Sequence, residues 1–197
     1  MYNQLKSSIP VAAHKRIEEL LSGKRFEIKI KNPRKTRHGD YRKLREGGHV
    51  ITINNNLNKY RFLITLVHEI AHYETYLEFG SRIKPHGLEW KQTYQHLMLP
   101  FLRPEIFPGK LLGLLAQHFK NPKASTDSDQ VLSMALRDYD RPNGKITIFE
   151  IAEGSKFKAS NGKFFRKGPK RRTRYKCIEL ESGRVYLFAA FAEIEPI

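Results

Sequence analysis

The segment Leu66-Val67-His68-Glu69-Ile70-Ala71-His72-Tyr73 has the clearest structural pattern in this chain. Its apolar positions recur at helical spacing and predict a buried helix over residues 57–79 that ends at Gly80. Because His68 and His72 are four residues apart, a helix places both imidazoles on one face, one turn apart. The stretch therefore predicts a helix that carries a pair of histidines side by side.

This spacing of histidines, with a glutamate between them, is typical of a catalytic zinc site. Two imidazoles on one helix face can bind one metal ion, and Glu69 then projects beside it. There the carboxylate can take a proton from a zinc-activated water and pass it to a leaving amine. The alternative is a pair of partly buried histidines that only form hydrogen bonds within the core.

A catalytic zinc ion needs a third protein ligand and one open position. His86 follows His72 by fourteen residues, in Lys84-Pro85-His86-Gly87, and a chain that leaves the helix at Gly80 can return to bring it to the metal. Three carboxylates are alternatives: Glu74, Glu78 and Glu89. Glu89 is the strongest of them, because the other two lie on the same helix as the first two ligands.

Three segments together resemble the SprT-like metallopeptidases, which include bacterial SprT and the eukaryotic Spartan proteases. They are the His68–His72 motif, Glu78-Phe79-Gly80 and Pro85-His86-Gly87-Leu88-Glu89-Trp90-Lys91, preceded by the strand-like stretch at residues 48–54. The resemblance implies a compact zincin-like domain with Zn²⁺ bound by His68, His72 and His86, and Glu69 as general base. It also implies protein substrates that are bound or crosslinked to DNA.

The C-terminal region departs from that family. Many bacterial relatives carry a zinc ribbon there, whereas this chain has a single cysteine, Cys177. We therefore expect a small β module without a metal.

The chain as a whole is expected to be α+β. A metallopeptidase domain is predicted over residues 1–125, with helices over 10–21, 57–79, 88–99 and 110–119 and strands over 26–30 and 49–54. Residues 126–143 are expected to form a linker with a short helix. From residue 144 to 197, short alternating stretches and the turn signals Asn161-Gly162 and Ser182-Gly183 predict the basic β module.

The charge balance points to a polyanionic partner. Lys and Arg number 36 against 20 Asp and Glu, a formal net charge of +16, and such an excess is typical of proteins that contact nucleic acid. Residues 156–176 hold ten basic residues, no acidic one and several aromatics. The aromatics are expected to fill the core of the β module. The basic residues expected to contact DNA phosphates are Lys167, Lys170, Arg171, Arg172 and Arg174.

The sequence therefore predicts a zinc metalloendopeptidase that acts on DNA-bound or DNA-crosslinked proteins. With one cysteine and no apolar run of membrane-spanning length, we expect a cytoplasmic protein, associated with the nucleoid if the source is bacterial, and no membrane partner. Two other functions fit the sequence. One is a general or self-cleaving intracellular peptidase without a DNA role, and the other is a DNA-binding protein whose metal site is structural.

Overall fold

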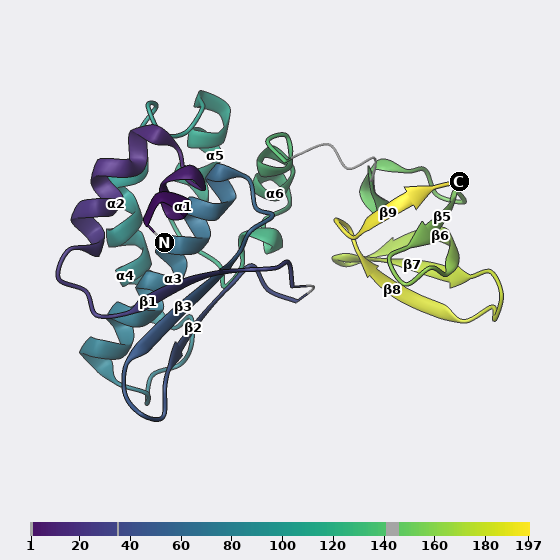
Figure 1. Cartoon of the computed structure of the whole chain (residues 1–197). Helices are drawn as coiled ribbons and strands as arrows, with labels where there is room; N and C mark the ends of the chain where they lie inside the picture. Colours follow the sequence, from purple (N-terminus) through teal and green to yellow (C-terminus); the bar gives the residue numbers. More distant parts are fainter. Residues whose placement is uncertain (1, 35, 141–145) are drawn as a thin grey trace. The chain divides into compact units, whose positions relative to one another are not determined.

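The structure of the chain is a computed structural model that describes residues 2–34, 36–140 and 146–197 (Figure 1). The chain divides into two compact units, Met1–Asp140 and Arg141–Ile197. The described residues of the two units form helices and two β-sheets, so the fold is mixed α+β. None of the helices in the described ranges is long and apolar enough to span a membrane.

The first unit combines six α-helices with a three-stranded sheet in its described part. The α-helices are α1 (Tyr2–Ser7), α2 (His14–Leu21), α3 (Lys59–Phe79), α4 (Leu88–Met98), α5 (Gly109–His118) and α6 (Gln130–Arg137). Short 3₁₀ helices are η1 (Val11–Ala13), η2 (Leu99–Phe101) and η3 (Thr126–Ser128). The strands are β1 (Glu27–Lys31), β2 (Gly39–Lys43) and β3 (His49–Asn54).

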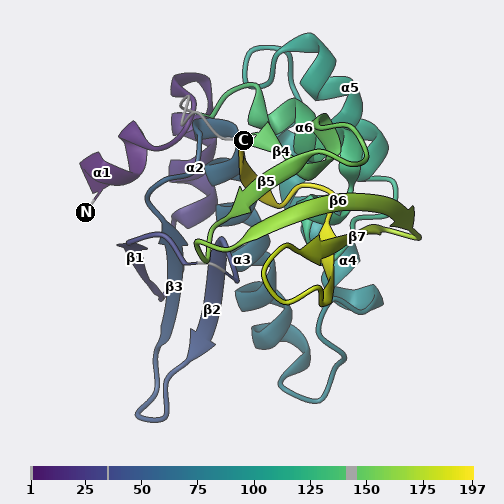
Figure 2. The same cartoon turned by 90° about the vertical axis from the view of Figure 1, so that its right-hand side faces the viewer.

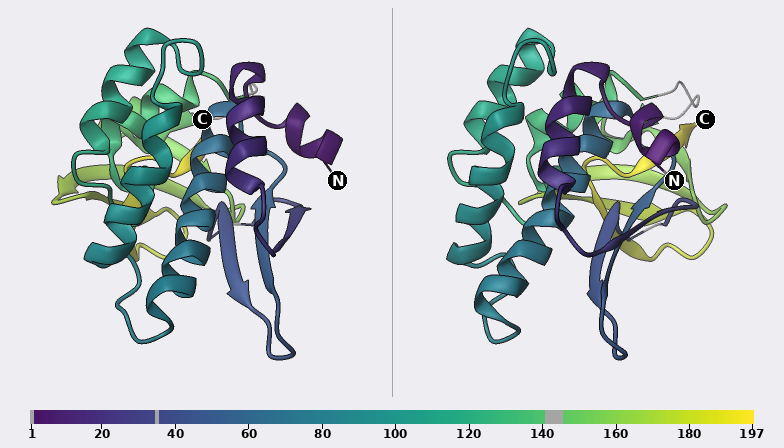
Figure 3. Two further views of the ribbon diagram at one scale, coloured as in Figure 1. Left: turned by 90° about the vertical axis from the view of Figure 1, so that its left-hand side faces the viewer. Right: turned by 60° about the vertical axis from the view of Figure 1, so that its left-hand side comes forward.

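Strand β3 is the middle strand of this sheet. It pairs in parallel with β1 and antiparallel with β2, which gives the order β1-β3-β2 and leaves β2 at an edge. Ile51 and Ile53 are fully buried, and the helices cover one face of the sheet (Figure 3). The expected strands at 26–30 and 49–54 correspond to β1 and β3, whereas β2 was not expected, and the helix expected over 10–21 is divided into η1 and α2.

Helix α3 runs through the middle of the first unit. Buried apolar residues, among them Phe62, Leu66 and Ile70, lie on several sides of the helix, as expected for a helix surrounded by protein. Asn58 caps its N-terminus, because its side chain accepts hydrogen bonds from the backbone N–H groups of Tyr60 and Arg61. Near its other end, Leu77 is 54% exposed.

The linker expected over residues 126–143 contains a helix that belongs to the first unit. Leu132 and Leu136 of α6 are fully buried in the same core as α3 and α5. The Asn58 side chain also donates to the Leu136 carbonyl at 2.8 Å and to the Asp140 carboxylate at 2.6 Å. The core of this unit is therefore completed by residues up to 140. The last expected linker residues, 141–143, and the expected start of the β module at 144 lie outside the described residues.

Replacing Asn58 with Ala is expected to destabilise the first unit by about 2–3 kcal/mol, because it removes a helix cap and two further hydrogen bonds. Asn58→Ser retains the capping oxygen but not the amide donors, and should lose about half as much. Chemical denaturation followed by far-ultraviolet circular dichroism measures the difference. An Ala variant as stable as the wild type would show that the hydrogen bonds of the Asn58 side chain contribute nothing to the free energy of unfolding.

The second unit is a curved antiparallel sheet around a small core. Its described strands are β4 (Ile146–Thr147), β5 (Lys156–Ala159), β6 (Phe164–Arg171), β7 (Arg174–Glu179), β8 (Val185–Ala189) and β9 (Glu193–Pro196), with the 3₁₀ helix η4 (Ile148–Glu150). The strand order is β4-β9-β5-β6-β7-β8, and Figure 2 shows β5, β6 and β7 side by side. Of the four aromatics expected in the core, Phe157, Phe165 and Tyr175 are buried, whereas Phe164 is 49% exposed, contrary to the expectation.

Candidate metal centre

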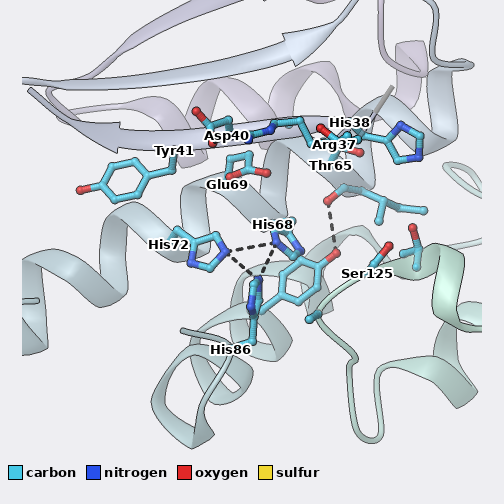
Figure 4. Close-up of a pocket in the computed structure, with 16 residues that line it drawn as sticks. Arg37, His38, Asp40, Tyr41, Thr65, His68, Glu69, His72, His86 and Ser125 are labelled. Carbon is cyan, nitrogen blue, oxygen red and sulfur yellow. Dashed lines mark hydrogen bonds and ion pairs between the residues drawn. The ribbon is translucent and has the colours of Figure 1, made fainter. Parts of the chain in front are cut away.

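Three histidine side chains converge in the first unit. Helix α3 supplies His68 and His72, one turn apart, and the segment between α3 and α4 supplies His86. Their Nε2 atoms are separated by 3.2 Å (His68–His72), 3.0 Å (His72–His86) and 3.3 Å (His68–His86), as the dashed lines in Figure 4 show. Among the described residues, these three form the group of His, Cys, Asp or Glu side chains that could hold a metal ion.

A tight turn brings His86 back to α3. The backbone N–H of Gly87 donates to the Lys84 carbonyl at 2.9 Å, and a Cβ on Gly87 would lie 2.8 Å from that same carbonyl oxygen. His86 itself has a φ of 58°, a left-handed conformation that few non-glycine residues adopt and that tends to occur at functional sites. The backbone therefore holds this imidazole in place at some conformational cost.

The three imidazoles are held in their neutral form. Burial lowers the pKa of His68 well below its usual value, and the neighbouring His72 and His86 lower it further. Burial, followed by the charge of His86, lowers the pKa of His72 to about 4, and burial also lowers that of His86. A neutral imidazole is the form that binds a metal, because its unprotonated nitrogen has a free lone pair.

Trp90 of α4 packs against all three imidazoles. Its ring centroid lies 4.7 Å from those of His68 and His86 and 5.2 Å from that of His72. The side chain is fully buried, so it supports the histidines from the side of the protein core. Their rings are consequently fixed by packing before any ligand binds.

The geometry of the histidines fits a zinc ion. Nitrogen ligands at about 2.0–2.1 Å in a tetrahedral arrangement lie about 3.3 Å from one another. The observed Nε2 separations of 3.0–3.3 Å match this value. Catalytic zinc sites, unlike structural ones, have three protein ligands and one open coordination position. Three neutral nitrogen donors beside an open cleft fit that ligand set.

The Glu69 carboxylate is buried between α3 and β2 (Figure 4). Burial raises its pKa to about 8, and the negative charge of Asp40 contributes, while a hydrogen bond from the Tyr41 backbone N–H opposes the shift. Asp40 is held by ion pairs with Arg37 and Arg42. A carboxyl group whose pKa is raised in this way can both accept and release a proton near neutral pH.

Strand β2 makes this arrangement possible. A Cβ added at Gly39 would lie 2.5 Å from Glu69 Oε1 and 2.7 Å from Thr65 Cγ2, so only a residue without a side chain lets the strand approach the carboxylate. Gly39, Asp40 and Tyr41 were not expected from the sequence to belong to the site. Tyr41 is the single large apolar residue of β2, and a strand with so few apolar residues gives a weak sequence signal.

A cavity of about 490 Å³ opens in front of the histidines. Residues 36–41 line one side, α3 contributes Thr65, Glu69 and the two histidines, and residues 124–126 line the opposite side. Arg37 and Ser125 both line this space (Figure 4). The histidine group is therefore reached through a cleft rather than enclosed in the core.

The alternative third ligands are placed elsewhere. The Glu74 side chain forms an ion pair with Lys24, Glu78 is exposed near the end of α3, and Glu89 lies in the first turn of α4 beside Gly87. None of the three belongs to the histidine group or lines the cavity.

The basic residues expected to contact DNA are divided between two environments in the second unit. Lys170, Arg171, Arg172 and Arg174 are exposed around the β6–β7 turn. Lys167 differs, because its ammonium group donates to the Ile151 carbonyl at 2.6 Å and lies 4.1 Å from the centroid of the Tyr175 ring. With only 6% of its surface exposed, Lys167 stabilises the β module and is not available to a phosphate, contrary to the expectation.

Comparison with known proteins identifies the family of the N-terminal half of the chain. Residues 11–105 match the sequence model of the SprT-like family. No curated protein and no solved structure gave a match. The matched region contains the three histidines, Glu69 and Gly39, that is, the histidine group and the strand that packs on it. Over residues 11–105, this chain therefore belongs to the SprT-like family.

Proposed function

We propose that the chain is a zinc-dependent metalloendopeptidase of the zincin type that acts on proteins bound or crosslinked to DNA. The observation that carries the proposal is the convergence of three neutral imidazole nitrogens, 3.0–3.3 Å apart, beside a buried carboxyl group in an open cleft. Membership of a family of metallopeptidases supports it.

In this mechanism His68, His72 and His86 hold the metal, and Trp90 fixes their rings. A bound zinc ion would polarise the scissile carbonyl and make water a better nucleophile at neutral pH. Glu69 takes the proton of the attacking water and delivers it to the leaving amide nitrogen. Its raised pKa suits both halves of this transfer, because the group must gain and then lose the same proton.

The cleft offers an extended polypeptide a place to bind. Strand β2 pairs only with β3 in the described sheet, so backbone N–H and C=O groups of its outer edge are available to a further strand, apart from the Tyr41 N–H, which donates to Glu69. Residues 36–41 line the cleft along this edge. A substrate chain that adds to β2 by backbone hydrogen bonds would pass in front of the histidines and Glu69, which favours cleavage within a chain.

The DNA role rests on charge. The net charge of +16 and the exposed cations of the second unit favour a polyanionic partner. Binding of the second unit to DNA would raise the local concentration of DNA-bound proteins around the cleft.

The test is degradation of a basic DNA-binding protein by the zinc-loaded chain, with and without single-stranded DNA, against the Glu69→Gln variant. Cleavage that requires DNA and is lost in the variant supports the whole proposal. Cleavage that is indifferent to DNA would leave a general peptidase. If no condition gives cleavage that depends on Glu69, the site is structural and the proposal is wrong.

Gly39→Ala is expected to lower both activity and stability. The new methyl group would displace Glu69 or β2, and a misplacement of about 1 Å at a reacting group costs on the order of 100-fold in rate, while overpacking costs about 1–3 kcal/mol of stability. Gly113→Ala is the matched control, since a Cβ there meets nothing within 4 Å. Initial rates and thermal unfolding of both variants check this; equal rates for Gly39→Ala and the wild type would contradict the role of this contact.

A further inference from the structure

Strand β8 is an unprotected edge of the sheet in the second unit. Within the described residues it pairs with β7 alone, and the sheet ends there (Figure 1). The strand reads Val185-Tyr186-Leu187-Phe188-Ala189, without a charged residue, a glycine or a proline, and its pairing with β7 has no register shift. Proteins use such features to protect an edge strand, because a bare edge pairs readily with another chain. The other edge strand of this sheet, β4, has only two residues and is protected by being short.

The outer edge of β8 has backbone hydrogen-bonding groups that β7 does not use. Facing residues of antiparallel strands alternate between pairs that exchange hydrogen bonds and pairs that do not. The Glu179 N–H donates to the Arg184 carbonyl at 2.9 Å, so the alternation leaves Val185 and Leu187 as residues that form no hydrogen bonds with β7. Their N–H and C=O groups therefore point outward from the sheet, where a further strand can pair with them.

Large apolar side chains lie on both faces of this edge. Val185 is 60% exposed, Leu187 48% and Tyr186 39%. Tyr186 pairs with the buried residue Cys177 and so lies on the core side of the sheet, whereas Val185 and Leu187 lie on the opposite face. A strand added to the edge would therefore find apolar contacts on either side of its backbone.

Strand β7 adds cations behind the edge. The register pairs Leu187 with Lys176 and Ala189 with Arg174, so both cations share a face with Leu187. Both are exposed, and neither takes part in the ion pairs found among the described residues of the second unit. Because adjacent strands are about 4.8 Å apart, these long side chains can extend across β8 toward a strand on its outer side.

We propose that β8 binds an extended polypeptide segment of alternating acidic and apolar residues, which adds to the sheet as a further antiparallel strand. Its backbone would pair with that of Val185 and Leu187. Residues directly opposite these two would share their face of the sheet, so acidic side chains at those positions would meet Lys176 and Arg174. The apolar residues between them would cover Tyr186 on the other face.

Charge decides among the occupants that a bare edge can accept. A second copy of this chain would bring another Lys176 and Arg174 onto the same face of a joined sheet, and each copy has a formal net charge of +16. Nucleic acid would satisfy the cations but has no peptide backbone to pair with the edge. The inference goes beyond the proposed function and does not depend on it, since all of these residues belong to the second unit.

The test measures binding of the full chain to a fluorescent decapeptide of alternating Glu and Val by anisotropy. The Glu69→Gln background keeps the peptide intact. N-methylation of its Glu residues removes the N–H groups that would face Val185 and Leu187, and should weaken binding roughly tenfold or more. N-methylation of its Val residues leaves that edge of the peptide free and should have little effect. A peptide of alternating Lys and Val should not bind.

Two pairs of protein variants locate the site. Leu187→Pro removes an outward N–H, a change that an edge strand tolerates, and should weaken peptide binding roughly tenfold. Leu187→Thr keeps that N–H and should lose much less. Lys176→Gln should weaken binding about threefold, whereas Lys170→Gln, which removes a cation from the β6–β7 turn, should bind as the parent does. Circular dichroism checks that each variant is folded, and the N-methylated peptides test the edge without any change in the protein.

Several results would overturn the proposal. Equal binding of the two N-methylated peptides would exclude strand addition, and equal binding of the Glu and Lys peptides would exclude recognition by charge. Equal losses for Lys176→Gln and Lys170→Gln would place the peptide elsewhere. If sedimentation showed a dimer that Leu187→Pro dissociates, the edge would belong to a second copy of the chain. If Leu187→Pro abolished binding of an oligothymidine, the edge would belong to nucleic acid.

Discussion

Glu69→Gln is expected to reduce the rate of peptide-bond cleavage by about 10²–10⁴-fold, the usual contribution of a general base. Glutamine has nearly the same shape as glutamate and can still receive the Tyr41 N–H hydrogen bond seen at Glu69, so the fold and the histidine group should be unchanged. It cannot take up a proton, however, and proton transfer is the step assigned to this residue. Initial rates on an unfolded protein substrate, with zinc content measured in parallel, give the comparison.

The matched control for this variant is Glu89→Gln. Glu89 is a carboxylate three residues after His86, in the first turn of α4, but it does not line the cavity. It should cleave at the rate of the wild type. A Glu69→Gln enzyme that retains full activity would show that another group carries the proton, and one that has lost its zinc would show that the variant acts through the metal rather than through proton transfer.

His72→Ala is expected to abolish stoichiometric zinc binding and, with it, all cleavage. Its Nε2 atom lies within 3.2 Å of both other histidine nitrogens, so its loss leaves two ligands and an opening toward the cleft. Loss of a residue that only orients a ligand already costs 10- to 100-fold in metal affinity, and loss of the ligand itself should exceed that. Competition with a chromophoric chelator measures the affinity.

His96→Ala is the control for this second variant, because His96 is exposed on α4 and lies outside the histidine group. Its zinc affinity should equal that of the wild type. If His72→Ala retained the wild-type affinity for one zinc ion per chain, the metal would have to be bound elsewhere in the protein, and the three histidines would have another role.

Much of the candidate metal centre could be predicted because the sequence pattern that forms it is local. The spacing of His68 and His72 on a strongly apolar helix determines their relative position without any tertiary contact, and α3 was expected to within two residues at its start. The role of His86 could not be predicted from spacing alone, which left Glu89 as an alternative third ligand. The proximity of His86 to the other two histidines depends on a turn in which His86 itself adopts a left-handed conformation.

The parts that the sequence did not reveal depend on tertiary contacts. Strand β2 is polar and exists because β3 offers it a partner. Helix α6 is short and follows a polar segment, so only the burial of Leu132 and Leu136 shows that it belongs to the first unit. Lys167 lies in a basic run, but the alternation of β6 turns it inward onto Tyr175. In each case pairing or packing, rather than composition, decides the environment.

One zinc ion held by His68, His72 and His86 is expected to make this chain a peptidase. The most direct measurement is titration of zinc into the metal-free chain while cleavage of an unfolded protein is followed and the fragments are identified by mass spectrometry. We expect no cleavage without metal, a rise to a plateau at one zinc ion per chain, and loss of activity on adding a chelator. Cleavage at the full rate in the metal-free chain, or none at one equivalent of bound zinc, would contradict the claim.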